Sequence, residues 1–379
     1  MFRNRIAVNI IFFLNGFVYG NWSSRIPRIQ ELYQVSDQVI GFVLLALALG
    51  GVAAMPFTGW IILKNGSRKI TLVAIVLYCA FVPFIPFMPG WGALVFLYLI
   101  MGIVTGMLDV AVNSQGVMVE QLYGRPIMTS FHAFFSIGMA LGAWCGAFFS
   151  GTSLELYHHF FIAGGLSLLA TVWVRYNLVY DNKGNLKPEG PLFRLPDRAL
   201  LSIGIITFCC MLGEGAMANW SVKYMESVVL SSQTLAPIAL SAFATAMTLG
   251  RIFGDRVRTI AGDANLIVGG GIVSTAGLIL SILVPNSYTV IAGCFLVGLG
   301  LSTIVPVSYS IAGSRKDIPS GVGIAMVTTV GYSGFLLGPP VIGFIAELKD
   351  LRFGLSVVAV LLSVMTVLGI FLKRSRRVG

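Results

Sequence analysis

Apolar segments of about twenty residues follow one another along almost the whole chain, separated by mostly short polar linkers. A helix of roughly twenty apolar residues spans the ~30 Å hydrocarbon core of a bilayer, so each segment predicts a membrane-spanning helix. A transmembrane β-barrel would need stretches of about ten residues that alternate apolar and polar, and these runs are too long and too uniform. We therefore expect an all-α integral membrane protein with twelve spans. The predicted spans are Ile6–Ser24, Gln38–Leu63, Ile70–Phe87, Ala93–Met118, Ile127–Ser150, Leu156–Val179, Ala199–Val222, Leu235–Gly254, Leu266–Val284, Tyr288–Ala312, Gly321–Ala346 and Phe353–Leu372.

The placement of the basic residues predicts the orientation in the bilayer. If the N-terminus is cytoplasmic, twelve spans put both termini and alternate linkers inside, together with twenty of the lysines and arginines. The outer set is Arg25, Arg28, Lys223, Lys349 and Arg352. Cytoplasmic loops of membrane proteins carry such an excess of basic residues. The net charge of +10 is therefore explained by orientation, and we expect no nucleic-acid partner.

The longest polar linker covers residues 181–198 and lies between spans six and seven. Its proline, glycine and mixed charge favour a connector over a folded domain. It divides the chain into an N-terminal six-helix bundle at 1–180 and a C-terminal six-helix bundle at 199–379. Six spans per half is an even number, so both halves insert with the same orientation.

An internal repeat supports this division. Asn21-Trp22-Ser23 in span one recurs as Asn219-Trp220-Ser221 in span seven, 198 residues later. A basic residue follows each copy at the same distance, Arg25 in the first and Lys223 in the second. Parallel repeats of this kind occur in transporters whose substrate site lies between the two halves near the midplane. We expect two bundles related by pseudo-two-fold symmetry.

Ionisable residues inside the spans are the first candidates for function. Asp109 lies near the middle of span four, with Asn113 one turn later on the same face, and Glu214 lies near the middle of span seven. His132 lies about a turn and a half into span five, whereas His159 adjoins an outer loop and is expected to be solvated. A charge at the centre of a span costs on the order of 3 kcal/mol, so such residues mark ion or proton sites. Asp109, Glu214 and His132 are candidate proton-coupling groups; the alternative is a structural role in hydrogen bonds between helices.

Amide and aromatic side chains form a candidate solute site. Amides offer paired donors and acceptors and aromatic faces stack on sugar-like rings, so together they suit a small polar solute. The candidate contacts are Asn15, Tyr19, Asn21, Trp22, Asn113, Asn219 and Trp220. The two tryptophans are equally consistent with anchors at the membrane interface. Arg25 and Lys223 are candidate contacts for an anion, or they extend to lipid headgroups.

Glycines and one proline predict special packing. Gly102 and Gly106 in span four, and Gly138, Gly142 and Gly146 in span five, recur at every fourth position. This spacing is typical of helices whose backbones approach closely in a membrane. Pro306 predicts a kink within span ten.

The six-plus-six arrangement with a central cytoplasmic linker resembles the major facilitator superfamily over the whole chain. Members carry G-x-x-x-D-[RK]-x-G-R-[RK] between spans two and three, and the residues that cover this pattern are Gly59, Lys64, Gly66 and Arg68. Leu63 stands where the acid of the pattern belongs. In the second half, Asp255 and Arg256 form an acid–base pair at the end of span eight. The resemblance implies that these residues belong to a cytoplasmic gate.

Two further stretches, Phe131–Ala143 in span five and Glu214–Ser221 in span seven, resemble the YbjJ-like bacterial inner-membrane group near the fucose-permease branch. The usual acid of that group after Met-Ala is replaced by Asn219. The resemblance implies solute transport in the bacterial inner membrane, and the placement of the basic residues predicts that both termini are cytoplasmic.

The chain contains no phosphate-binding loop of the G-x-x-x-x-G-K-[ST] type and no H-E-x-x-H metal motif. We therefore expect neither an enzyme nor a cofactor or metal. The sequence favours a secondary transporter that moves a small polar, sugar-like solute by alternating access, coupled to protons and functional as a monomer. Export of amphipathic compounds driven by protons is the alternative, and a membrane sensor or scaffold is a third interpretation. Substrate, direction and the choice between protons and sodium stay open.

Overall fold

The computed structural model describes residues 1–35, 37–150, 152–181, 197–232 and 235–378, and every regular element among them is a helix. In chain order these are α1 (Phe2–Ser23), α2 (Ile26–Tyr33), α3 (Asp37–Asn65), α4 (Ser67–Phe81), the 3₁₀ helix η1 (Val82–Phe87), α5 (Trp91–Tyr123), α6 (Met128–Ser150), α7 (Leu156–Val174), α8 (Arg198–Ser227), α9 (Ala236–Ala261), α10 (Asp263–Leu283), α11 (Ser287–Leu301), α12 (Ile304–Gly313), α13 (Ser320–Leu348) and α14 (Leu351–Val378). Each predicted span is found as a helix or a pair of consecutive helices.

Several helices run one or two turns beyond their apolar segments. α9 continues past Gly254 to Ala261, through charged residues that favour a helix but not the bilayer core. Among the described residues, the helices of eleven predicted spans are long and apolar enough to cross a membrane, and α9 is not one of them. The sequence does not predict α2, because its eight residues are too few and too polar to cross a bilayer.

The chain divides into two compact units. The first consists of Met1–Gly124, Phe131–Leu195 and Gly313–Met326, and the second of Arg125–Ser130, Pro196–Ala312 and Val327–Gly379. Most of each unit comes from one predicted half, while the start of α6 and the start of α13 belong to the unit of the other half. The predicted limits of the two halves, at residues 180 and 199, border a linker of which residues 182–196 lie outside the described ranges. These limits stay a prediction.

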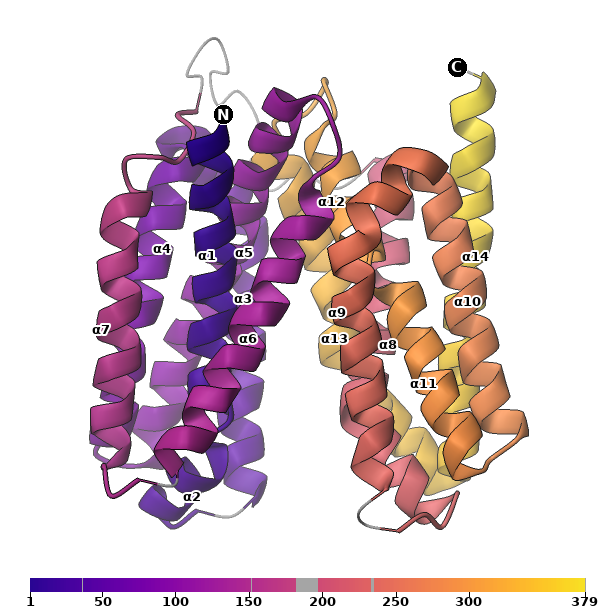
Figure 1. The fold of residues 1–379 in the computed structure, drawn as a ribbon, viewed down its shortest axis with the longest axis horizontal. Helices are drawn as coiled ribbons and strands as arrows, with labels where there is room; N and C mark the ends of the chain where they lie inside the picture. Colours follow the sequence, from indigo (N-terminus) through magenta and orange to yellow (C-terminus); the bar gives the residue numbers. More distant parts are fainter. Residues whose placement is uncertain (36, 151, 182–196, 233–234, 379) are drawn as a thin grey trace. The chain divides into compact units, whose positions relative to one another are not determined.

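Close backbone contacts organise the first unit, whose helices α1, α4, α5 and α7 stand side by side in Figure 1. α3 packs along α5, and a Cβ at Gly102 or Gly106 would collide with a backbone carbonyl oxygen of α3. A Cβ at Gly138 or Gly142 would likewise collide with a carbonyl oxygen of α1. The predicted role of both glycine series is confirmed at these positions.

The second unit contains a broken span. α11 ends at Leu301 and α12 begins at Ile304, so span ten is interrupted at Ser302 and Thr303. Pro306 explains the break, because it has no N–H to donate to the carbonyl of Ser302 four residues earlier. The predicted kink is thus found one turn before the proline. Around it, α11 packs against α9 and α10, and α10 packs against α14.

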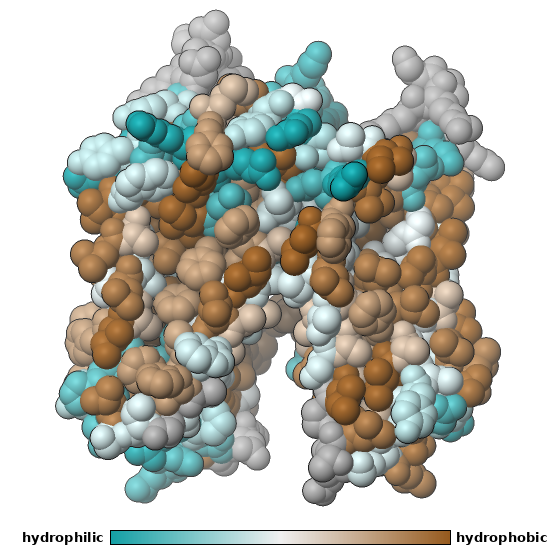
Figure 2. Space-filling view, in the orientation of Figure 1, coloured by the Kyte–Doolittle hydropathy of each residue, from teal (hydrophilic) through white to brown (hydrophobic). Residues whose placement is uncertain are grey.

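The surface of each unit fits a lipid environment. Large apolar side chains such as Phe96, Leu169, Phe344 and Phe371 are exposed on the flanks of the helices. Hydrophilic residues gather toward the helix ends in the view of Figure 2. In water such exposed apolar flanks would be costly, whereas hydrocarbon removes that cost.

Candidate functional site

Three polar side chains meet inside the first unit, from α5 and α6. Asn113 Nδ2 donates to the backbone carbonyl of Asp109 at 2.8 Å and to its carboxylate Oδ1 at 3.2 Å. His132 Nε2 lies 3.1 Å from Asn113 Oδ1, which makes Nε2 the donor. Asn113 is fully buried and His132 nearly so. The sequence predicts that Asp109 and Asn113 share a helix face; the structure adds His132 to the same chain of hydrogen bonds.

Aromatic rings enclose the histidine end of this chain. The Phe12 ring lies 5.0 Å from the imidazole and stacks on Phe131 at 5.7 Å. Ser136 donates to the carbonyl oxygen of His132, one turn earlier in α6. The amide between them holds its donor toward the acid and its acceptor toward the histidine, so hydrogen bonds link the two titratable groups through Asn113.

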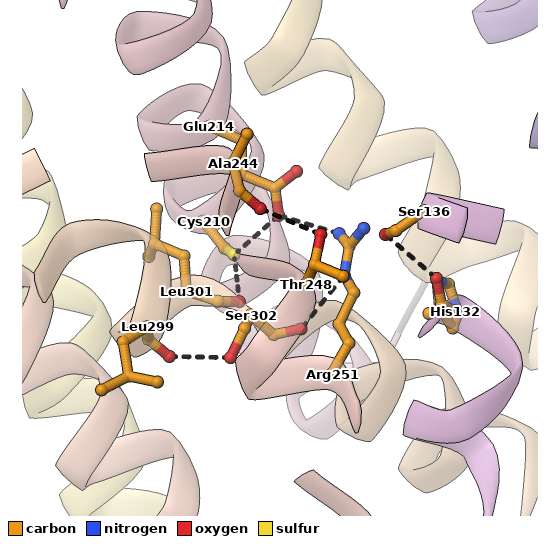
Figure 3. A network of polar contacts seen from close by, with 10 residues as sticks. All are labelled: His132, Ser136, Cys210, Glu214, Ala244, Thr248, Arg251, Leu299, Leu301 and Ser302. Carbon is orange, nitrogen blue, oxygen red and sulfur yellow. Dashed lines mark hydrogen bonds and ion pairs between the residues drawn. The ribbon is translucent and has the colours of Figure 1, made fainter. Parts of the chain in front are cut away.

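The second intramembrane carboxylate, Glu214 of α8, has a charged partner. Its Oε1 lies 3.8 Å from a terminal nitrogen of Arg251 in α9, and the Cys210 thiol donates to the same oxygen at 3.8 Å. Figure 3 shows this cluster beside the break in span ten, where Arg251 Nε donates to the carbonyl of Ser302 at 3.4 Å. The Cys210 thiol also approaches the carbonyl of Leu301 at 3.6 Å.

Arg251 belongs to this cluster, and the sequence reasoning did not select it. It lies within the predicted eighth span, yet the orientation argument counts it with the basic residues of the cytoplasmic side. Its side chain is only 11% exposed and that of Glu214 is 19% exposed. An arginine inside an apolar window was the signal, since a buried charge needs a partner of opposite sign.

The first copy of the repeated motif is satisfied within its own unit. Asn21 is fully buried, and its Oδ1 lies 2.7 Å from His159 Nε2. Trp22 is also buried; its Nε1 donates to Tyr78 Oη at 2.9 Å, and its ring meets Tyr98 edge-on at 5.2 Å. Trp22 is therefore no interfacial anchor. The expectation that His159 is solvated is wrong, because the histidine fills the space beside Asn21.

The other candidates on α1 are more accessible. Asn15 is half-buried, and Tyr19 is exposed with its ring edge-on to Trp22 at 5.2 Å. Arg25 is 6% exposed and donates from its guanidinium to the carbonyl of Gly146 at 3.1 Å. It also lines a surface cavity of about 400 Å³ between the start of α2 and the loop after α6.

The second copy of the motif is arranged differently. Asn219 is exposed and donates to the carbonyl of Gly215 in its own helix at 2.7 Å, so its amide oxygen faces outward. Trp220 packs against Gly343, and its Nε1 has no hydrogen-bond partner among the described residues. The exposed Lys223 ammonium lies 5.2 Å from the Trp220 ring centroid. The Asn and Trp of the motif are thus buried in the first unit, whereas Asn219 is exposed and Trp220 is partly exposed in the second.

These environments predict opposite results for two matched tryptophan substitutions. Trp22→Phe removes the donor to the buried Tyr78 hydroxyl, and an unsatisfied buried polar group costs about 1–3 kcal/mol. We expect a clearly lower melting temperature in detergent for Trp22→Phe and little change for Trp220→Phe, whose indole N–H has no such partner among the described residues. Differential scanning fluorimetry of both purified variants measures this. Equal destabilisation by the two substitutions would contradict the assignment.

The predicted gate loop in the first half has an acid that the sequence pattern did not reveal. Gly66 precedes α4 with a φ of +83°, a conformation that favours glycine. Asp181, at the start of the central linker, accepts from Ser67 Oγ at 2.7 Å and from the Arg68 backbone N–H at 3.0 Å. It thereby caps the N-terminus of α4.

The remaining residues of that loop have separate surroundings. A Cβ at Gly59 would lie 3.0 Å from the Ala325 Cβ, so α3 approaches the start of α13 closely here. Lys64 is exposed and lies 3.9 Å above the Trp60 ring.

In the second half, Asp255 also caps a helix. Its two carboxylate oxygens accept from the backbone N–H groups of Thr129 and Ser130, both at 2.8 Å, at the start of α6. Arg256 is exposed, whereas Arg258 is buried and bonded to Asp263 at 2.7 Å. The arginine that is tied into this end of the unit is thus Arg258, which the sequence analysis did not select.

Comparison with known proteins shows the family. The profile of the Major Facilitator Superfamily matches residues 8–317. An uncharacterised MFS-type transporter of Yersinia pestis is 33% identical, with 94% of this chain and 93% of the relative covered, and an uncharacterised transporter of Sinorhizobium fredii is 30% identical, with 96% of each covered. The membrane protein MosC of Rhizobium meliloti is 29% identical, with 98% of this chain and 90% of that protein covered.

Solved structures agree on the fold. The E. coli fucose:proton symporter FucP superposes with a TM-score of 0.81 at 15% identity, with 97% of each chain covered. The human organic anion transporter MFSD10 superposes with a TM-score of 0.79 at 13% identity, covering 97% of this chain and 99% of that chain. The chain therefore belongs to the Major Facilitator Superfamily and is a multi-pass membrane transporter, not an enzyme.

Proposed function

We propose that this protein is a proton-coupled secondary transporter that moves a small polar solute across the bacterial inner membrane by alternating access. The observation that carries the proposal is the hydrogen-bonded chain from Asp109 through Asn113 to His132, deep in a unit made of apolar helices. A carboxyl and an imidazole have no structural need to be placed together in such surroundings, and proton relays of transporters use these groups. The similarity in fold to a fucose:proton symporter supports the same interpretation.

We assign proton uptake and release first to Asp109. His132 is linked to this acid through Asn113 and is the group affected by its protonation. Glu214 is the second candidate, but its ion pair with Arg251 changes the chemistry, because the arginine must also be neutralised whenever the acid is protonated. Access of water from alternate sides would let either acid load a proton on one side and release it on the other.

Solute contact falls mainly on the accessible residues. In the second unit these are Asn219, with an amide oxygen not used by the helix, and the partly exposed ring of Trp220, whose Nε1 atom is itself buried. In the first unit Asn15 and Tyr19 are accessible, whereas Asn21 and Trp22 support the helices that present them. This set suits a polar solute with hydroxyl groups.

The caps formed by Asp181 and Asp255 suit a gate. Each places a carboxylate against the N-terminus of a helix, where the helix dipole favours negative charge. Such contacts are strong when the helix end is close and are lost when it moves away. We assign them to the cytoplasmic side, on which the excess of basic residues puts both termini, and we assign transport to the monomer.

Uptake into proteoliposomes tests the proposal. The purified protein is reconstituted, and sugars, polyols and organic acids are screened with an imposed inward proton gradient. We expect at least one polar solute to accumulate, and accumulation to collapse when a protonophore removes the gradient. Transport of a solute at a rate that ignores the proton gradient would contradict proton coupling and favour facilitated diffusion or another ion.

A further inference from the structure

A surface cavity lies between the start of α2 and residues 150–155, at the end of the first unit away from the N-terminus. Figure 1 shows α2 at that end of the unit. Ile29 anchors α2 by its burial, and the Tyr33 hydroxyl donates to the carbonyl of Ile85 at 2.5 Å and accepts from the N–H of Met88 at 3.0 Å. The cavity has a volume of about 400 Å³, which is within the range of small-molecule sites.

A buried arginine forms part of the cavity wall. Arg25 is 6% exposed, and its Nη1 donates to the carbonyl of Gly146 at 3.1 Å. The end of α1 can approach α6 this closely because Gly146 has no side chain, since a Cβ there would collide with Ser24 Oγ. Arg25 Nε has no hydrogen-bond partner among the described residues. A buried charge needs a partner of opposite sign, so this guanidinium favours an anion in the cavity.

The charged side chains that line the cavity are two arginines and two glutamates. Arg28 and Glu31 form an ion pair with each other at 2.9 Å. Arg25 and Glu155 are the other two, and neither forms an ion pair with any described residue. Glu155 is exposed, and its side chain makes no hydrogen bond to the N-terminus of α7. The cavity therefore presents one positive and one negative group that are not yet compensated.

These two groups determine the class of ligand. A simple anion at Arg25 would share the cavity with the carboxylate of Glu155, and a simple cation at Glu155 would share it with the guanidinium. A molecule that carries both charges compensates both groups at once. Guanidinium groups bind phosphate and carboxylate through strong charge-assisted hydrogen bonds, and an ammonium group offers three donors to a carboxylate. Ser150 and Ser153 add hydroxyl groups to the lining.

We propose that this cavity binds a zwitterion, with its phosphate or carboxylate group at Arg25 and its ammonium group at Glu155. Such a ligand is either a free solute or the headgroup of an aminophospholipid, since both carry the same charged groups. The distribution of basic residues predicts that this end of the unit faces the outer side, and we expect the ligand to enter from there. The inference concerns a binding site of its own and does not rest on the proposed function.

Glycerophosphoethanolamine is the probe, because it is soluble and carries a phosphodiester and an ammonium group. Glycerophosphoglycerol has the same phosphodiester without the ammonium group. For the wild-type protein in detergent, at constant ionic strength set with sodium chloride, we expect glycerophosphoethanolamine to raise the melting temperature saturably by about 3 °C and glycerophosphoglycerol to have a clearly smaller effect. Equal effects of the two compounds, or no effect of either, would overturn the inference.

Glu155→Gln is the decisive variant, because this exposed side chain can be changed without disturbing the core. We expect it to weaken the response to glycerophosphoethanolamine and to remove the preference over glycerophosphoglycerol. Arg25→Gln should lose both responses and Arg25→Lys should retain part of them, with circular dichroism to verify that these variants at a buried position are folded. Glu226→Gln, which removes an exposed carboxyl from α8, is the matched control and should respond as wild type does. A Glu155→Gln protein that keeps the wild-type preference would contradict the proposed ammonium contact.

Nanodiscs distinguish a free solute from a lipid headgroup. The protein is placed in phosphatidylglycerol nanodiscs with or without phosphatidylethanolamine, and equilibrium binding of radiolabelled glycerophosphoethanolamine is measured. Binding in both lipid compositions would support the site and identify its ligand as a free solute. Binding that is lost when phosphatidylethanolamine is present would support the site and identify the lipid headgroup as its ligand. Absence of binding in both compositions would overturn the inference, and the proposed transport function would be unaffected.

Discussion

Asp109→Asn is expected to abolish accumulation driven by a proton gradient while solute exchange continues. Asparagine keeps the shape of the side chain and an oxygen for the Asn113 amide, which now lies 3.2 Å from Oδ1, but it cannot take up or release a proton. We expect uptake against a gradient to fall to the level that remains when a protonophore removes the proton gradient. Counterflow of labelled solute should remain within a few fold of wild type.

Three variants make this result specific. Glu226→Gln removes an exposed carboxyl near the end of α8 and should leave both assays unchanged. His132→Gln should retain part of the coupling, because Asp109 keeps its proton site. Glu214→Gln should retain more of the coupling than Asp109→Asn, because the first coupling role falls on Asp109. Normal accumulation by Asp109→Asn would remove this acid from the mechanism and shift the coupling role to Glu214.

Gly102→Val is expected to prevent the first unit from folding. A Cβ at this position would collide with the carbonyl oxygen of Leu47, and Gly50 faces Leu99 in the same way from the opposite helix. Backbone atoms of two packed helices cannot yield as a flexible side chain can. Overpacking costs typically about 1–3 kcal/mol when side chains adjust, and more is expected here. Size-exclusion chromatography of detergent-solubilised protein should show loss of the monodisperse peak.

Gly165→Ala is the matched control for this substitution. Gly165 lies in the interior of α7, and a Cβ there would meet nothing within 4 Å. Alanine also favours a helix over glycine by up to about 1 kcal/mol, so this variant should be as stable as wild type or slightly more stable. A monodisperse, thermally stable Gly102→Val protein would show that α3 and α5 can separate without loss of the fold.

Most of the fold could be predicted from local sequence features, namely apolar runs, glycine spacing and one proline. A run of apolar residues has to become a helix in hydrocarbon, since its backbone groups find no other partners there. Glycine at every fourth position placed the close contacts of α5 and α6, and Pro306 placed the break in span ten, because a missing Cβ or a missing N–H acts within one turn. The family followed from short motifs at fixed distances.

The candidate site was less predictable, because its residues depend on partners far away in the chain. Arg251 and Glu214 are 37 positions apart, and Asp181 caps a helix that begins at Ser67. No spacing rule links such positions. The two copies of Asn-Trp-Ser have the same sequence. The indole N–H of Trp22 nevertheless donates to Tyr78, whereas that of Trp220 has no hydrogen-bond partner among the described residues.

The sequence by itself thus determined the solvent, the helical class, the segments that span the membrane and the family, since these follow from composition and local periodicity. Tertiary structure decided which polar residues are buried and hydrogen-bonded and which stay accessible. Burial and hydrogen-bond satisfaction depend on the side chains that packing brings together, so identical residues such as Asn21 and Asn219 acquire different surroundings.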